Sequence, residues 1–252
     1  MSKSIIAICF IVFFMATPGN SQIDSFFQQG NQHYQNQEYD LARDQYLSAL
    51  EQGYESASLY YNLGNAYFKM SDLGNAILYY EKAKKLAPQD PDIQFNLQIA
   101  QLYIVDKITA SEKAFVLKIW NEIIGFFSTN QLAFIALLFY LMGCILLIMR
   151  WTIRRHAVAI WTRRLFIPVS IAFIFFGLLF GLNLWYDGQT AEGIVMVEKV
   201  DVMSSPAGDA TAVFSLHEGL KVQLQEKSGE YWRIRLSDGK VGWLPQSSVQ
   251  QI

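Results

Sequence analysis

Two long stretches of the chain contain no charged residue. Residues 132–149 and 165–185 hold no Asp, Glu, Lys or Arg. A helix of about 20 apolar residues is long enough to cross the hydrocarbon core of a bilayer. The pattern therefore predicts two transmembrane helices, over residues 131–149 and 165–186. The alternative is that both stretches are buried core helices of a soluble domain.

A shorter apolar run, from Ile5 to Met15, lies near the start of the chain. Lys3 precedes this run, and small residues with one proline follow it. The run is too short to span a bilayer, and its basic, apolar and small-residue regions are typical of a secretory signal. We expect residues 1–21 to be a signal peptide, so the chain that follows begins outside the cytoplasm.

The segment between the two apolar stretches, residues 150–164, is strongly basic and contains no acidic residue. Cytoplasmic loops of membrane proteins carry an excess of Lys and Arg. The segment is therefore predicted to be a cytoplasmic loop, which places both soluble flanks on the outer side. We expect a membrane protein with two spans and two soluble domains on its outer side. The five arginines of this loop are Arg150, Arg154, Arg155, Arg163 and Arg164.

Between the signal peptide and the first span, residues 22–112 are predicted to form one domain, within which residues 23–90 repeat with a period of 34. The matched pairs are Gly30 with Gly64, Ala42 with Ala76, Tyr46 with Tyr80 and Ala49 with Ala83. This pattern resembles the tetratricopeptide repeat, whose period is 34 residues. The resemblance implies two helical hairpins, in which Gly and Ala allow close helix contact and aromatic rings fill the space beside them. Residues 91–106 are predicted to be a capping helix or a degenerate third repeat.

The resemblance also implies a binding groove on the concave face that the first helices of the repeats form. Three positions of each repeat are expected to face it. The residues at these positions are Phe27, Asn31, Tyr34, Tyr61, Asn65 and Phe68, followed by Phe95, Ile99 and Leu102. An aromatic groove with a line of Asn suits an extended protein segment held by side-chain amides. The alternative is that these aromatics only complete the helical stack.

Residues 113–127 have apolar side chains at helical spacing and polar side chains between them. This pattern predicts a juxtamembrane amphipathic helix that lies on the outer membrane interface. The alternative is a helix that packs on the domain before it.

Residues 190–252 have short runs of β-forming residues separated by Gly-containing turns. Asp238-Gly239 between two such runs predicts a hairpin turn. The segment resembles bacterial SH3-type domains, on motifs such as Tyr231-Trp232-Arg233-Ile234 and Gly242-Trp243. The resemblance implies a small β barrel that binds cell-wall peptides or protein segments. Trp232 and Trp243 are then either ligand contacts at the barrel rim or part of the barrel core.

The composition and the motifs of the chain limit which kinds of binding or catalytic site we expect. Charged residues make up 17% of the chain and the net charge is −2, so no basic surface for nucleic acid is indicated. The two cysteines and three histidines lack metal-ligand spacing, and the sequence has no nucleotide-binding loop, nucleophile-elbow serine motif or zinc-protease motif. We expect no metal, no cofactor and no enzymatic activity.

The predicted fold is thus a multi-part membrane protein. It combines all-α tetratricopeptide hairpins, two transmembrane helices and a C-terminal all-β SH3-like barrel. This order of parts, with Val105-Asp106-Lys107-Ile108 after the repeats and Ser128-Thr129-Asn130-Gln131 before the first span, resembles the BatE-like family of the Bat aerotolerance operon.

The family resemblance implies a non-enzymatic scaffold in the lipid bilayer of a bacterial inner membrane, with both soluble domains in the periplasm. Its expected partners are von Willebrand A-type Bat membrane proteins in stress or oxygen tolerance. Two alternatives stay open: a cell-envelope sensor that binds peptidoglycan, and an assembly chaperone for exported proteins.

Overall fold

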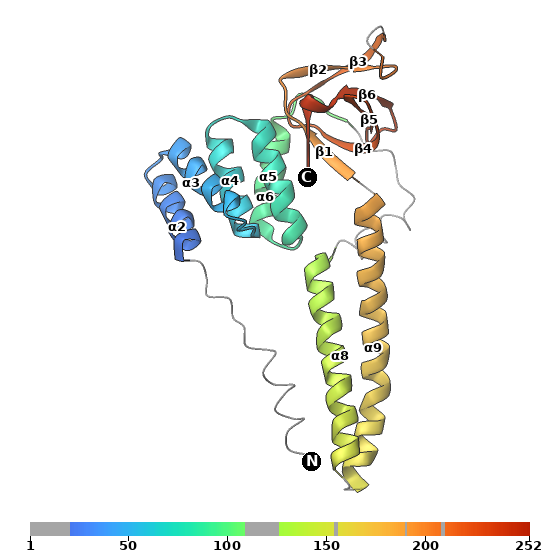
Figure 1. The fold of residues 1–252 in the computed structure, drawn as a ribbon. Helices are drawn as coiled ribbons and strands as arrows, with labels where there is room; N and C mark the ends of the chain where they lie inside the picture. The colour runs from blue at the N-terminus through green and yellow to red at the C-terminus, as the bar shows by residue number, and fades with distance from the viewer. Residues whose placement is uncertain (1–20, 109–125, 154–155, 190, 208–209) are drawn as a thin grey trace. The chain divides into compact units, whose positions relative to one another are not determined.

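A computed structural model describes residues 21–108, 126–153, 156–189, 191–207 and 210–252 (Figure 1). The predicted signal peptide and most of the predicted juxtamembrane helix lie outside the described residues. Backbone contacts divide the chain into two compact units, Met1–Glu55 and Ser56–Ile252. The described parts of each unit are treated separately below.

The first unit contains a helical hairpin of α2 (Ser21–Gln35) and α3 (Tyr39–Glu51), which pack on each other. The connecting turn places Gln37 at a φ of 65°, in the left-handed region that reverses the chain tightly. Ala42, Tyr46 and Ala49 are buried, so α3 presents the small and aromatic side chains of the repeat pattern to its partner helix.

The second unit begins with three further helices, α4 (Ala57–Lys69), α5 (Leu73–Leu86) and α6 (Pro91–Leu102). Each start is fixed by a side chain that accepts from a backbone amide of the first turn: Ser56, Asp72 and Asp90. Such caps satisfy amides that have no partner within the helix. Helix α5 packs against both α4 and α6.

A cluster of aromatic side chains also joins α4 to α5. The Tyr79 ring stacks on Tyr67 with ring centres 5.5 Å apart, and Lys82 Nζ lies 5.5 Å from the centre of the Tyr79 ring. Burial raises the pKa of Tyr79 above its ordinary value. The charged form is disfavoured because the ring cluster removes it from water.

Stability should therefore fall at alkaline pH. An acid whose pKa is raised by folding stabilises the folded state fully below its unfolded pKa, about 10 for Tyr. That contribution is lost as the pH rises through the folded-state pKa. Urea unfolding between pH 8 and pH 11.5 should show a shallower alkaline loss for Tyr79→Phe than for the wild type. Equal slopes for the two proteins would contradict this assignment.

Two long apolar helices follow, α8 (Thr129–Thr152) and α9 (His156–Gln189), and they pack along each other. Both are long and apolar enough to cross a membrane. Ser128 and Gln131 form a capping box at the start of α8. Thr129 Oγ1 donates a hydrogen bond of 2.9 Å to Oδ1 of Asn183, which is buried in α9.

The helices extend further than the sequence predicts. Residues 150–164 were expected to form a loop, but Arg150 lies in the last turn of α8, and Arg163 and Arg164 lie within α9. Helix α8 continues to Thr152 and helix α9 begins at His156, because charge alone does not end a helix. The segment contains no Pro or Gly that would break one.

The C-terminal part is an antiparallel sheet in the order β3-β2-β6-β5-β4-β1-β7, here called the β domain. Its core is a cluster of aliphatic side chains that includes Val202, Ile234 and Leu244. The strands are β1 (Ala191–Val195), β2 (Lys199–Met203), β3 (Ala212–His217), β4 (Lys221–Ser228), β5 (Tyr231–Arg235), β6 (Val241–Pro245) and β7 (Val249–Gln251), with a short 3-10 helix, η1 (Gln246–Ser248), before β7.

Two details of the sheet bear on the sequence pattern. The β-forming run from Val195 to Val202 is split, because β1 ends at Val195 and β2 begins at Lys199. The predicted turn at Asp238-Gly239 is confirmed: it joins the paired strands β5 and β6, and Gly239 has a φ of 94° that favours glycine.

Candidate functional site

The same tyrosine–asparagine hydrogen bond occurs in both repeats. Tyr46 Oη donates to Asn31 Oδ1 at 2.8 Å in the first hairpin, and Tyr80 Oη donates to Asn65 Oδ1 at 2.7 Å in the second. Both tyrosines are almost fully buried, so each hydroxyl needs an internal partner. The predicted line of Asn is therefore also part of the hairpin structure.

Glycine permits this arrangement. A Cβ atom at Gly64 would lie 2.5 Å from Cδ1 of the Tyr80 ring, and a Cβ at Gly30 would clash with the Tyr46 ring in the same way. The first helix of each hairpin can thus approach the tyrosine ring only where it has no side chain.

Gly64→Ala should therefore destabilise the second hairpin. The added methyl group forces the Tyr80 ring to move, and overpacking of this kind costs about 1–3 kcal/mol. The gain in helix propensity, about 1 kcal/mol, offsets only part of that cost. Thermal unfolding of the variant checks this result. Ser58→Ala, at an exposed position of the same helix, is the control and should leave the transition unchanged.

A hydrogen-bonded network connects α4 to α6. Asn96 Nδ2 donates to Tyr61 Oη at 2.9 Å and to Asn65 Oδ1 at 2.8 Å. The structure thus brings together two of the predicted groove residues, Tyr61 and Asn65. Asn96 was not among the predicted groove residues. The signal that could have found it is its position in α6, which corresponds to the first helix of a third repeat.

The aromatic groove candidates of the second unit pack within that unit. The Tyr61 ring lies 6.1 Å from the Tyr80 ring, and the edge of Phe68 contacts Tyr103 at 5.7 Å between ring centres. In the first unit, Phe27 contacts Tyr46 at 6.0 Å, and Tyr34 contacts Tyr39 at 5.3 Å.

All six predicted groove residues are half-buried, so each keeps part of its surface open to a ligand. Their packing supports the hairpins, and their exposure leaves a binding role possible for the same side chains. The third set is more open. Phe95 and Leu102 are 62% and 66% exposed.

The two tryptophans of the β domain are half-buried. Trp232 packs on the aliphatic core, and Lys227 Nζ lies 5.7 Å from its ring centre. Trp243 pairs with Arg233 of β5 and with Met203 of β2. The Trp232 ring therefore has structural contacts, and both tryptophans keep open surface.

A polar hollow of about 420 Å³ lies on the β domain, between the β4–β5 turn and the end of β6. Neither tryptophan lines this hollow. Gln246 closes one side through its side chain, which donates to the carbonyl of Gly229 at 2.6 Å. The hollow contains one cation and one carboxylate, Lys227 and Glu230, which suits a polar or zwitterionic ligand. The sequence did not single out these residues.

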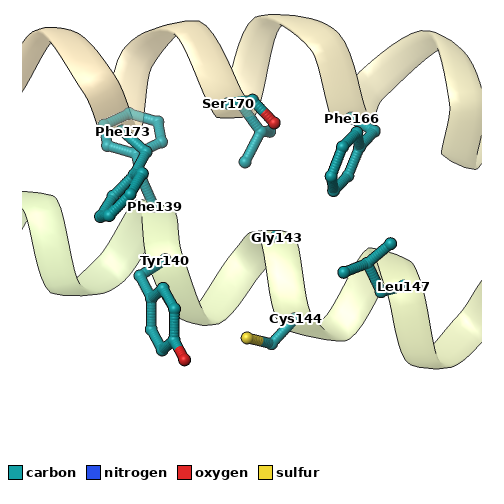
Figure 2. Close-up of a pocket in the computed structure, with 9 residues that line it drawn as sticks. Phe139, Tyr140, Gly143, Cys144, Leu147, Phe166, Ser170 and Phe173 are labelled. Atoms are coloured by element: carbon teal, nitrogen blue, oxygen red, sulfur yellow. The ribbon is translucent and has the colours of Figure 1, made fainter.

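A smaller apolar hollow of about 170 Å³ lies between α8 and α9. Figure 2 shows Phe166, Ser170 and Phe173 of α9 opposite Gly143 and Leu147 of α8. Its lining is mainly aromatic and aliphatic, and Tyr140, Cys144 and Ser170 are the polar side chains among the residues that line it.

Within the ranges that the structure describes, no group of three or more His, Cys, Asp or Glu side chains is arranged to hold a metal ion. Asp238 accepts from the backbone and side chain of Lys240, and these hydrogen bonds lower the pKa of its carboxyl group. Asp238 lies in the turn between β5 and β6, and these contacts suit a structural role.

Comparison with known families shows that residues 27–91 match the tetratricopeptide repeat family. The chain therefore contains tetratricopeptide repeats. No curated protein matches the chain. Tetratricopeptide repeats indicate a role in protein–protein interaction.

Proposed function

We propose that this protein is a non-enzymatic scaffold that is anchored in the bacterial inner membrane and presents two modules to the periplasm. The observation that carries the proposal is the tetratricopeptide match, together with half-buried groove residues that keep exposed surface on their helices. Repeat stacks of this kind bind protein segments on the faces of their first helices. The C-terminal β domain, as an SH3-type barrel, is the second module.

The membrane anchor is the hairpin of α8 and α9. Its described apolar side chains are largely exposed, as in Phe134, Ile145 and Ile174. A soluble domain rarely leaves so large an apolar surface in water, and lipid is the solvent that suits it. Arginines gather where α8 ends and α9 begins, which supports a cytoplasmic position for that end.

The order of the parts supports a place in a Bat-type aerotolerance or stress complex. Its partners there would be von Willebrand A-type Bat membrane proteins. Joining two recognition modules on one anchor raises the effective concentration of a partner that both modules can reach.

A second candidate function is a cell-envelope sensor that binds peptidoglycan. The polar hollow on the β domain, with Lys227 and Glu230 in its lining, favours this candidate. Wall peptides carry both carboxylates and amines, which match these charges. Binding to purified peptidoglycan tests this candidate. If Lys227→Ala reduces the binding and Tyr61→Ala leaves it unchanged, the result would favour the sensor over the scaffold.

Reporter fusions test the topology. Alkaline phosphatase, which is active only outside the cytoplasm, should be active when fused after residue 110 or after residue 252. A fusion after His156 should be inactive. An inactive reporter at residue 252 would mean that one of the two apolar helices does not cross the membrane.

Cross-linking in intact membranes tests the scaffold itself. The expected result is recovery of von Willebrand A-type Bat proteins with the wild-type chain. Recovery of wall fragments alone would favour the sensor, and recovery of exported proteins caught during assembly would favour the chaperone.

A further inference from the structure

The β domain and the repeat helices of the second unit are in direct contact. Residues Ser56–Ile252 form one compact unit, and within it helix α5 contacts strand β1. Most of the polar contacts are made by residues His217–Lys221, here called the docking loop, which run from the last residue of β3 to the first residue of β4. The partners of the docking loop are distant in sequence: Gly74 and Glu81 lie 144 and 140 positions from the residues that contact them, and Asp106 lies 111 positions away.

The centre of this contact is a lysine held by two carboxylates. Lys221 Nζ lies 3.1 Å from Oε2 of Glu81 on α5 and 2.6 Å from Oε2 of Glu192 on β1. The Glu81 side chain is only 7% exposed, so its charge needs a close cation. Burial by itself would lower the pKa of Lys221, but attraction to Glu81 and Glu192 outweighs it and raises that pKa.

A second carboxylate of the docking loop binds the start of α5. Glu218 Oε1 accepts from the backbone amide of Gly74 at 2.7 Å. A carboxylate at this position satisfies a free first-turn amide and suits the positive end of the helix dipole. A Cβ at Gly74 would lie 3.0 Å from Glu218 Cγ, so glycine allows the close approach.

A third polar contact joins the segment that follows α6 to the docking loop. The backbone amide of His217 donates to Asp106 Oδ2 at 2.6 Å, and His217 Nδ1 lies 3.0 Å from Asp106 Oδ1. Both oxygens of Asp106 are therefore used by one residue of the docking loop.

Apolar contacts complete the surface. Gly219 has a φ of 84°, and a Cβ there would lie 2.9 Å from Ile77 Cδ1 of α5. Leu73 and Ile104 border the same position at 3.4 Å. Ile108, beyond α6, packs on the core of the β domain.

These contacts use one face of α5, which carries Gly74, Ile77 and Glu81. The neighbouring face carries Tyr80, whose hydroxyl holds Asn65 of the predicted groove. Residues three and four apart lie close together on a helix, and Tyr80 follows Ile77 by three residues. Helix α5 therefore connects the docking loop to the groove.

We propose that the docking loop clamps helix α5, so that the β domain and the second repeat form one cooperative unit and the β domain keeps the groove residues in place. This goes beyond the proposed scaffold, since it makes the two modules interdependent rather than joined only by the chain. The clamp depends neither on the identity of a partner nor on membrane topology.

Hydrogen exchange of the full-length protein in detergent micelles, followed by mass spectrometry, tests the clamp. Lys221→Met leaves Glu81 without its cation and should speed exchange in peptides from α4 and α5 by about tenfold or more. Lys227→Met is the matched control, because it makes the same change on the same strand at an exposed lysine outside the clamp. It should change exchange in α4 and α5 less than twofold.

Glu218→Ala gives a second, milder test. It removes only the carboxylate that binds Gly74, and should speed exchange at the start of α5. If Lys221→Met fails to fold, Glu218→Ala decides the question alone. Unchanged exchange of α5 in Glu218→Ala, or a Lys221→Met protein in which only the β domain exchanges faster, would overturn the proposal.

Discussion

Tyr80→Ala is expected to abolish the cooperative unfolding transition of the second repeat. Tyr80 is 1% exposed, its ring fills the space above Gly64, and its hydroxyl is bonded to Asn65. Removing a buried aromatic side chain costs about 3–5 kcal/mol, against a total stability of about 5–15 kcal/mol for a typical domain. Thermal unfolding of the full-length protein, followed by circular dichroism at 222 nm, measures the effect.

Tyr80→Phe separates the ring from the hydroxyl. It keeps the packing and loses the hydrogen bond, which costs about 1 kcal/mol. A clear transition at a slightly lower temperature is expected for this variant. If Tyr80→Ala unfolds like Tyr80→Phe, the ring contributes little and the hairpin depends on other contacts.

Tyr61→Ala combined with Phe68→Ala is expected to abolish recovery of a protein partner while the helices stay folded. Both side chains are half-buried and keep open surface on α4. Aromatic anchors at an interface often cost about 2 kcal/mol or more when truncated, which is roughly 30-fold in affinity for each. Cross-linked recovery of partners measures the result, and circular dichroism monitors folding.

Tyr61→Phe is the control for the hydrogen bond from Asn96. It keeps the ring and removes the hydroxyl, so partner recovery should fall far less than in the double variant. If the double variant unfolds, the aromatics are structural. If it stays folded and recovers the partner in full, binding lies elsewhere, with the β domain as the next candidate.

The repeat helices were predictable because their constraints are local and recur. Gly64 and Tyr80 each reappear 34 residues away, as Gly30 and Tyr46. Those spacings fix which residues meet within a hairpin. The Asn65–Tyr80 bond was within reach of the same reasoning, since both of its residues repeat at that period.

The contact between the β domain and α5 was not predictable. Glu81 and Lys221 are separated by 140 residues, and neither belongs to a repeated pattern. Each reads in the sequence as an ordinary surface charge. Only the folded chain shows that Glu81 is buried and that a lysine from another part of the sequence neutralises it.

The β domain was partly predictable from the sequence. Alternation of apolar residues indicated the strands near Trp232, and Asp238-Gly239 indicated the turn. Its polar hollow went unnoticed because Lys227 and Glu230 belong to the β4–β5 hairpin and Gln246 follows β6, and strand pairing brings these segments together.

The hydrogen bond from Thr129 to Asn183 restricts how the pair of long helices can move. Sliding α8 along α9 by one turn, about 5.4 Å, would break this bond and separate the stacked rings of Phe139 and Phe176. The hairpin therefore resists piston motion. A signal that travels along it would have to do so by tilting or bending, and Pro168 inside α9 marks the place where bending costs least.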